Sequence, residues 1–359
     1  MKVCINAGGT GGHIYPAISL AKFLKTQGDD FFFIGNQDSM EENVAKQNNI
    51  KFYPVKNYGV FKNTWKMKKR AVSSSMKSFR IALKYLKAEK PDILVAFGGY
   101  VAVPVVLAAY WLKIPVLLHE QNALAGKANR FLARFAKGIA LSYANSAASF
   151  KGKETRLTGN PRASDIAKLT KDATILEEYG LSQNQPILYF VMGSLGSLSI
   201  NKVLIEMLHN YPLENTQIII SGGIKNTKLL ERELADMPYI KVFPQVDQVK
   251  LLPFVDLVVS RSGATGLAEI MASGTPAILI PSPYVADNHQ YYNAKAFVDE
   301  KAALMLEEKD LSAERLYKKI KQVLDDEALR EKLHIQAKAL SYPDATEKIY
   351  QWMKEMIHE

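Results

Sequence analysis

The sequence contains a single cysteine, Cys4, among its 359 residues. One cysteine cannot form an internal disulfide or build a Cys-based zinc cage, so both are excluded. The six histidines are scattered, and neither an HExxH motif nor an Asp-x-Asp after a strand is present. The motifs GxSxG, GxGxxG and GxxxxGK[ST] are absent as well. We therefore expect no metal and no cofactor.

We also expect no secretory leader, because the apolar run that follows Met1 is broken by glycine after a few residues. Residues 93–112 carry no charge and satisfy the length rule for a membrane span. Gly98, Gly99 and Pro104 divide this run, which favours a buried strand, a glycine turn and a helix. We predict no transmembrane helix.

Acidic residues are nearly missing from residues 51–90, which hold twelve Lys/Arg and a single acid, Glu89. That window carries 12 − 1 = +11, whereas the whole chain carries +10, so the remainder sums to 10 − 11 = −1. The excess is one local patch and not the general positive coating of a nucleic-acid-binding protein. We expect no nucleic-acid partner.

Apolar runs rich in β-formers alternate with helical stretches, which is typical of parallel sheets with crossover helices. Strands are predicted at residues 2–7, 30–35, 52–55, 93–97, 116–119 and 138–141, and again at 186–192, 217–221, 241–243, 257–260, 277–280 and 302–305. Helices are predicted at 14–26, 73–88, 127–135, 163–179, 200–208, 265–272, 289–297 and from 313 onward.

The stop signal Gly159-Asn160-Pro161 separates the two sets of strands. We predict an α/β chain with two Rossmann-like, doubly wound domains, residues 1–162 and 163–340, that face a central cleft. Residues 341–359 form a C-terminal helix that could pack back on the N-terminal domain, although the sequence does not decide between the two halves.

Glycine-rich or polar turns follow three predicted strands of the first half. The first, GGTGGH at residues 8–13, allows close backbone approach to a ligand at a helix N-terminus. His13 in its first helical turn is placed to act as a general base, although the turn could serve packing alone. The others are FGGY, residues 97–100, and HEQN, residues 119–122, where Asn122 could instead be a helix cap.

The second half has polar turns of its own. Ser194 lies in a glycine turn, residues 192–197, whose N–H groups suit a diphosphate. Small residues after Arg261 open a helix on which the Glu269 carboxylate could accept both hydroxyls of a ribose, or could simply be solvated. Gln290 begins a further helix. These turns favour group transfer from a nucleotide-linked donor.

The motifs GGTGGHIYPA, FGGYV, HEQN, TGNPRAS, the GS-x-GS turn, SRSGA and PSPYVADNHQYYNA occur in an order that resembles the bacterial MurG family of N-acetylglucosamine transferases. This resemblance implies a GT-B fold and inverting transfer from UDP-N-acetylglucosamine to the C4 hydroxyl of MurNAc-pentapeptide in lipid I, which forms lipid II. It implies His13 as general base, with Glu120 or Tyr100 in reserve. It assigns donor contacts to Thr10, Gly11, Gly12, Asn122, Arg162, Ser194, Arg261, Ala264, Thr265, Glu269 and Gln290.

Two segments depart from the family pattern. Leu195 and Ser197 replace a polar residue and an alanine in the glycine turn, and Gly266 stands where the family often has threonine. Backbone N–H contacts survive such changes. Three alternatives remain open: a diacylglycerol glycosyltransferase, a UDP-N-acetylglucosamine 2-epimerase, and a non-catalytic binding protein for nucleotide sugars or nucleic acid.

The basic patch interleaves lysines with apolar side chains, which is the composition of a segment that lies on an anionic membrane surface. We predict that it docks a peripheral enzyme on the cytoplasmic leaflet of the cell membrane, beside lipid I and near other cell-wall synthesis proteins. The predicted contacts are Trp65, Lys66, Lys68, Lys69, Arg70 and Phe79. The alternative is a solvated basic helix whose apolar residues face the core.

Overall fold

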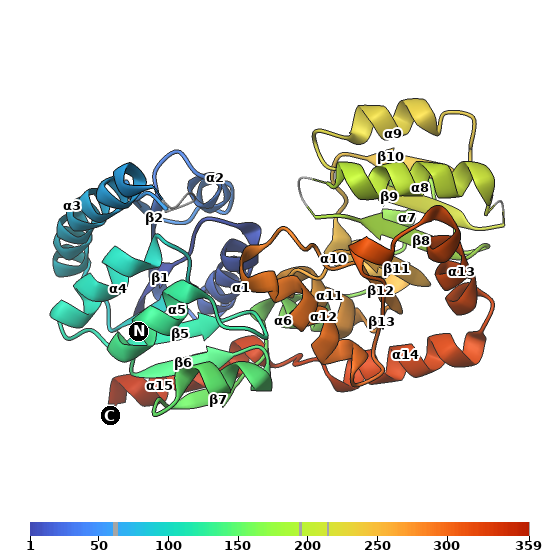
Figure 1. The fold of residues 1–359 in the computed structure, drawn as a ribbon. Coiled ribbons are helices and arrows are strands. Elements are labelled where there is room, and N and C mark those ends of the chain that lie inside the picture. Colours follow the sequence, from blue (N-terminus) through green and yellow to red (C-terminus); the bar gives the residue numbers. More distant parts are fainter. Residues whose placement is uncertain (60–63, 194–195, 214, 359) are drawn as a thin grey trace. The chain divides into compact units, whose positions relative to one another are not determined.

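A computed structural model of the chain describes residues 1–59, 64–193, 196–213 and 215–358. The chain divides into two compact units. The N-terminal unit comprises Met1–Ser164 together with Asp344–Glu359, and the C-terminal unit comprises Asp165–Pro343. Each is described by itself below (Figure 1).

The N-terminal unit is built on a seven-stranded parallel sheet in the order β3-β2-β1-β4-β5-β6-β7. The chain reverses its winding direction between β1 and β4, as doubly wound sheets do, and ligands bind such sheets at this point. Its strands are β1 Lys2–Asn6, β2 Asp30–Asn36, β3 Phe52–Val55, β4 Ile93–Ala96, β5 Val116–Glu120, β6 Gly138–Leu141 and β7 Thr155–Leu157.

Helices cover both faces of this sheet, so its central strands are apolar on both sides. Cys4 of β1 packs into the core beneath α3, α4 and α5, whereas its neighbours Val3 and Ile5 pack against α1 and α15. The helices of this unit are α1 Gly11–Thr26, α2 Met40–Gln47, α3 Trp65–Glu89, α4 Ala102–Trp111, α5 Lys127–Leu132 and α15 Ala345–His358, with 3-10 turns η1 Ala133–Phe135 and η2 Ala144–Phe150. Helix α6, Pro161–Ala167, spans the boundary between the two units.

The C-terminal helix α15 completes the second helical layer of the N-terminal unit. Its Trp352 is 2% exposed, and a Cβ atom added at Gly138 of β6 would lie 2.4 Å from the Trp352 ring. Glycine at that position therefore makes room for the indole. Lys137 donates a hydrogen bond of 2.9 Å to the carbonyl of Met356, which ties the end of the helix to the same edge of the sheet.

The C-terminal unit repeats the architecture with six parallel strands in the order β10-β9-β8-β11-β12-β13. The strands are β8 Ile187–Val191, β9 Gln217–Ser221, β10 Ile240–Phe243, β11 Leu257–Ser260, β12 Ala277–Leu279 and β13 Leu304–Met305. The helices are α7 Thr174–Glu178, α8 Leu198–Asn210, α9 Thr227–Glu233, α10 Gln248–Leu251, α11 Ala264–Ser273, α12 His289–Val298, α13 Ala313–Leu324 and α14 Glu327–Ala339, with 3-10 turns η3 Leu252–Phe254, η4 Ala286–Asn288 and η5 Glu308–Asp310.

The prediction of two parallel, Rossmann-like α/β units is confirmed, and several local details differ from it. Helices α2 and α9 were not predicted, and α3 begins at Trp65 instead of residue 73. Strand β7 was not predicted, because its three residues contain only one apolar side chain. The helical tract predicted from residue 313 onward is three helices, since Asp326 caps the start of α14 with a 2.9 Å hydrogen bond from the Leu329 amide and Pro343 precedes α15. The predicted tract 163–179 is two short helices, α6 and α7.

The uncharged run at residues 93–112 forms β4, a glycine turn and α4, as predicted. Among the helices that the structure describes, none combines the length and the apolar character required to cross a membrane.

Candidate active site

The polar turns of the N-terminal unit follow β1, β4 and β5, which are neighbours in the sheet. Because the strands are parallel, their carboxyl ends gather these turns at one edge. Gly99 has a φ of +82°, and a Cβ atom added there would lie 2.6 Å from the Gly8 carbonyl oxygen. The turns after β1 and β4 therefore touch through backbone, and this contact requires glycine.

His13 is the third residue of α1, and its amide donates to the Thr10 carbonyl at 3.1 Å. Its imidazole Nδ1 lies 2.8 Å from Oε1 of Gln121. Within the described residues, this is the one side-chain hydrogen bond that His13 makes. The HEQN sequence was recognised as a candidate element, but Gln121 was not assigned a role.

Glu120, a reserve candidate for the base, is only 1% exposed. One carboxylate oxygen accepts from the backbone and side chain of Asn122 at 3.0 and 3.1 Å. The other accepts from the Gly126 amide at 3.0 Å and from Asn129 at 2.9 Å. With four donors on its two oxygens, this carboxylate organises the loop after β5.

Tyr100, the second reserve candidate, accepts a hydrogen bond of 3.2 Å from the Asn36 side-chain amide. Burial, assisted by the nearby Glu41 carboxylate, raises the pKa of Tyr100. A raised pKa disfavours the phenolate that would act as a base. The hydrogen bonds of Glu120 and the raised pKa of Tyr100 thus count against both reserve candidates.

The remaining predicted residues of the N-terminal unit surround the start of α1. Thr10 is exposed and extended at the N-cap position, where its side chain makes no capping bond, and Gly11 and Gly12 form the first helical positions. The Arg162 guanidinium lies 5.7 Å from the ring centre of Tyr15. The structure thus gathers these residues and His13 around the start of one helix.

The C-terminal unit contains an open hollow of about 380 Å³ at the carboxyl ends of β8 and β11. Predicted residues Arg261 and Gln290 line it, and Ser194 lies outside the described residues. Its full lining is Val191, Met192, Gly193, Gly196, Ser197, Gln248, Ser260, Arg261, Gly263, Gly266, Ser282, Tyr284 and Gln290.

Glu269 is 6% exposed and lies on α11, the helix that Ala264 and Thr265 open. Its Oε2 accepts a hydrogen bond of 2.6 Å from Gln248, which lines the hollow. Because Glu269 is buried and hydrogen-bonded, it is not the solvated helix residue that the sequence analysis left as an alternative. Gln248 was not predicted, because a lone glutamine carries no pattern in the sequence.

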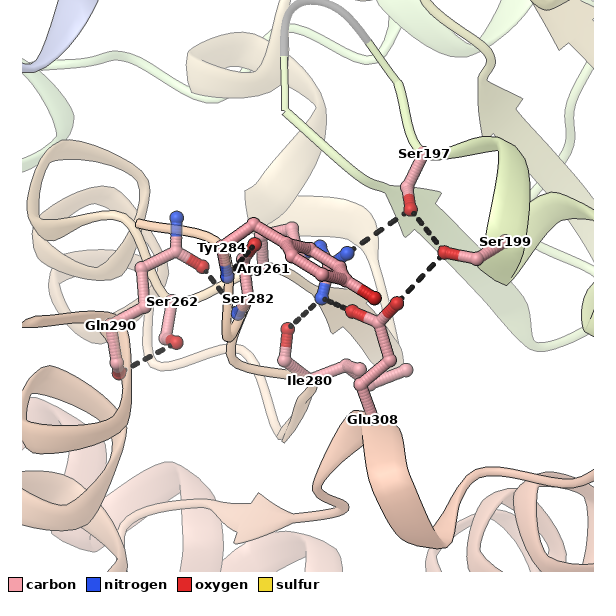
Figure 2. A network of polar contacts seen from close by, with 9 residues as sticks. All are labelled: Ser197, Ser199, Arg261, Ser262, Ile280, Ser282, Tyr284, Gln290 and Glu308. Atoms are coloured by element: carbon pink, nitrogen blue, oxygen red, sulfur yellow. Dashed lines mark hydrogen bonds and ion pairs between the residues drawn. The ribbon is translucent and has the colours of Figure 1, made fainter. Parts of the chain in front are cut away.

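The Arg261 guanidinium is the centre of an internal network (Figure 2). It forms an ion pair of 2.7 Å with Glu308, and the two side chains are 10% and 11% exposed. It also donates to Oγ of Ser197 at 3.0 Å and to the Ile280 carbonyl at 3.1 Å. Ser199 donates to the other Glu308 oxygen at 2.8 Å. Arg261 thereby holds the start of α8 beside β12.

Sequence reasoning missed Glu308 because it lies in the run Glu307-Glu308-Lys309-Asp310, which has the composition of an ordinary solvated surface. No signal in the sequence connects it with Arg261, 47 positions earlier (308 − 261). Arg261 was predicted as a donor contact, and the structure gives its guanidinium a bracing role in addition to a place in the hollow's lining.

Gln290 joins two loops at the hollow (Figure 2). Its side-chain oxygen accepts from the Ser282 amide at 2.9 Å, and its carbonyl accepts from Oγ of Ser262 at 2.8 Å. Asn293, one turn further along α12, donates to the Ser262 carbonyl at 3.2 Å. The segment after β11 is therefore tied to the start of α12. Across the ranges that the structure describes, no group of three or more His, Cys, Asp or Glu could hold a metal ion.

Both units match known domains. Residues 3–141 match the glycosyltransferase family 28 N-terminal domain, and residues 187–349 match the glycosyltransferase family 28 C-terminal domain. Together with the two parallel α/β units, these matches define the class as a glycosyltransferase of the GT-B fold.

The particular family follows from full-length relatives. The chain is 36% identical to the UDP-N-acetylglucosamine–N-acetylmuramyl-(pentapeptide) pyrophosphoryl-undecaprenol N-acetylglucosamine transferase of Bacillus licheniformis, over 100% of this chain and 99% of that protein. It resembles the crystal structure of Acinetobacter baumannii MurG with a TM-score of 0.79 at 30% identity, over 99% of both chains. The chain belongs to the MurG family. A putative UDP-N-acetylglucosamine 2-epimerase from Listeria monocytogenes, with a TM-score of 0.73 at 15% identity over 99% of this chain and 96% of that one, shares the fold alone.

The Arg261–Glu308 pair yields a stability prediction. Arg261→Met leaves a buried carboxylate without its cation, and we expect a loss of about 2–4 kcal/mol in the free energy of unfolding of the C-terminal unit. Adding Glu308→Leu removes the stranded charge, so the double variant should be more stable than the single one. Arg232→Met, which breaks an exposed pair with Glu233, is the control and should cost about 0.5 kcal/mol or less.

Urea unfolding followed by circular dichroism measures these losses. The three tryptophans, Trp65, Trp111 and Trp352, all lie in the N-terminal unit, so their fluorescence is an internal reference that should not shift. A double variant as unstable as the sum of the two single variants would show that Arg261 and Glu308 are not coupled.

Proposed function

We propose that this chain transfers N-acetylglucosamine from UDP-N-acetylglucosamine to the C4 hydroxyl of the MurNAc residue in lipid I, and so forms lipid II. The observation that carries the proposal is the relationship over the whole chain, since both units and not one shared domain match the Bacillus licheniformis enzyme. That enzyme's name specifies the donor and the diphosphate-lipid acceptor. The 2-epimerase alternative has only its fold in common with this chain.

The donor site of the proposal is the hollow of the C-terminal unit. The buried carboxylate of Glu269 supports this assignment. It can accept hydrogen bonds from the two ribose hydroxyls if the Gln248 amide moves away or shares the carboxylate with them. The glycine turn before α8 offers backbone N–H groups to the diphosphate, and Arg261 holds the first turn of that helix through Ser197. Gln290 borders the same hollow and can contact the sugar.

The chemical step is a single displacement at the anomeric carbon. His13 takes the proton of the acceptor C4 hydroxyl, the hydroxyl oxygen forms a bond to the anomeric carbon, and the bond to the diphosphate breaks with its electron pair leaving on UDP. Attack from the face opposite the leaving group converts the α linkage into β. Amides at a helix N-terminus stabilise the negative charge that develops on UDP.

Transfer of a labelled sugar tests the proposed function directly. UDP-[14C]N-acetylglucosamine is incubated with the purified chain and a lipid I analogue, with diacylglycerol, or without acceptor, and lipid products are separated. We expect label on the lipid I analogue alone. Label on diacylglycerol, or conversion of the donor to N-acetylmannosamine, either still linked to UDP or released by hydrolysis, would instead assign the chain to one of the alternative activities.

We further propose that α3 docks the enzyme on the anionic cytoplasmic face of the cell membrane, where lipid I is anchored. The support is an exposed surface around a shallow hollow of about 570 Å³. Trp65, Val72 and Met76 are 76%, 62% and 58% exposed and lie among the cations Lys69, Lys77 and Arg80. Such a surface buries apolar side chains between lipid headgroups while its cations meet anionic lipid.

The same helix turns other apolar residues inward, as the alternative of a basic helix facing the core expects for that part of it. Ala82 and Leu86 are buried in the core, and Phe79 packs against that core and lines an apolar hollow between α3 and α4. Phe79 is thus half-buried and is not part of the exposed face. Arg70 lies 3.8 Å from the ring centre of Tyr58, and the side chains of Lys66 and Lys68 lie outside the described part of the chain.

Charge reversal tests the docking surface. The triple variant Lys69→Glu, Lys77→Glu and Arg80→Glu should lose roughly 100-fold in affinity for vesicles containing phosphatidylglycerol, because each cation near the surface contributes about 1 kcal/mol. The matched control reverses Lys22, Lys25 and Lys354, which lie on α1 and α15 over the other face of the sheet. Co-sedimentation measures both. Equal losses in the two variants, or binding that ignores salt, would remove α3 from the docking proposal.

A further inference from the structure

A row of buried polar groups leads from the end of β7 to His13. His119 of β5 is fully buried, with 0% exposure, and Gln121 is 1% exposed. The imidazole of His119 lies between the Gly159 carbonyl and the Gln121 amide, and the Gln121 amide in turn lies between His119 and His13. Buried groups of this kind must match donors to acceptors throughout, so the position of each proton can be worked out.

The first proton that can be located is the one on the His119 imidazole. Its Nε2 lies 3.0 Å from the Gly159 carbonyl oxygen, which can only accept, so Nε2 carries a proton. Burial lowers the pKa of His119 to about 4, and the ring is therefore neutral at physiological pH. A neutral imidazole holds one proton, so Nδ1 of His119 presents a lone pair.

The orientation of the Gln121 side-chain amide follows from its neighbours. Its nitrogen lies 3.0 Å from the Phe97 carbonyl, 3.0 Å from the His119 carbonyl and 3.0 Å from the His119 Nδ1 lone pair. Rotating the amide by half a turn would place its oxygen against these three acceptors; the His119 carbonyl would keep its hydrogen bond from Asn129, but the Phe97 carbonyl and the His119 lone pair would lose this donor. The amide nitrogen must therefore face His119, and Oε1 must face His13.

The orientation of Gln121 in turn determines which nitrogen of His13 carries the proton. Its Nδ1 is 2.8 Å from Oε1 of Gln121, an atom that accepts and cannot donate. We propose that Gln121 is a positioning residue that holds neutral His13 with its proton on Nδ1, so that the lone pair on Nε2 is the atom that takes the acceptor's proton. The Gly159 carbonyl and His119 act through Gln121 in the same row, although neither contacts His13.

The catalytic meaning of this arrangement rests on the proposed function, whereas the tautomer itself rests on geometry alone. Neutral histidine in water favours the proton on Nε2, which would leave no lone pair on that nitrogen. A carboxylate partner would also fix the tautomer, but it would add a negative charge beside a base that serves two diphosphate-bearing substrates. A neutral amide orients the ring without that charge.

Nitrogen NMR of the full chain reads the tautomer without any substrate. In protein labelled with 15N-histidine at a pH where His13 is neutral, we expect the His13 Nδ1 signal to be of the protonated type and the Nε2 signal of the unprotonated type, with His13→Ala providing the assignment. Gln121→Met removes the acceptor and should shift His13 toward the Nε2-protonated form. Asn129→Leu is the matched control, because this equally buried amide donates to the His119 carbonyl without contacting His13.

Kinetics then separate positioning from a general structural effect. Gln121→Met should lower kcat by about 10- to 100-fold with little change in KM for UDP-N-acetylglucosamine, and His13→Ala by about 10²–10⁴-fold. The double variant should be no slower than His13→Ala, because Gln121 acts only through that ring.

Three results would overturn the proposal: a wild-type His13 protonated on Nε2, a His13 spectrum that Gln121→Met leaves unchanged, or losses in kcat that multiply in the double variant. If Gln121→Met does not fold, the 15N spectrum of the wild-type chain alone determines whether His13 carries its proton on Nδ1. If the wild-type chain transfers no sugar, the proposed function fails while the NMR result still decides the tautomer.

Discussion

The Gln121 amide has one acceptable orientation, because two backbone carbonyls and an imidazole lone pair surround its nitrogen. This constraint depends on the parallel sheet, which brings the ends of β4 and β5 together and places α1 beside them. It also depends on glycine at position 99, where a side chain would collide with the Gly8 carbonyl. The ring of His13, the proposed base, thus lies between backbone geometry on one side and the Gln121 amide on the other.

Much of this arrangement could be predicted from the sequence, because parallel strands place whatever follows them at one edge. The turns after β1, β4 and β5 and the helix that carries Glu269 were located from apolar runs and glycines alone. The partners of those residues could not be predicted. Glu308 and Gln248 have no distinctive spacing, and Gln121 was recognised only as a member of HEQN. Each acquires its role from a contact that only the folded chain creates.

The basic segment, residues 51–90, likewise shows which features the sequence predicts and which only the folded chain reveals. Its charge identified a surface, but the sequence could not separate the exposed face of α3 from the buried one. The structure makes that separation within a single helix, where Trp65 and Met76 are exposed and Leu86 is buried. The charge and the chemistry of the N-terminal unit therefore lie on different elements: α3 carries the cations, and the strand ends carry the polar groups proposed to handle the acceptor.

The most direct test of the central claim is the structure of the product formed by the purified chain from UDP-N-acetylglucosamine and a lipid I analogue. Proton and carbon NMR of the isolated lipid determine the position and configuration of the new glycosidic bond. The account predicts one N-acetylglucosamine in β linkage to C4 of the MurNAc residue for each UDP released. An α linkage, attachment at another hydroxyl, or UDP release without a disaccharide would contradict it.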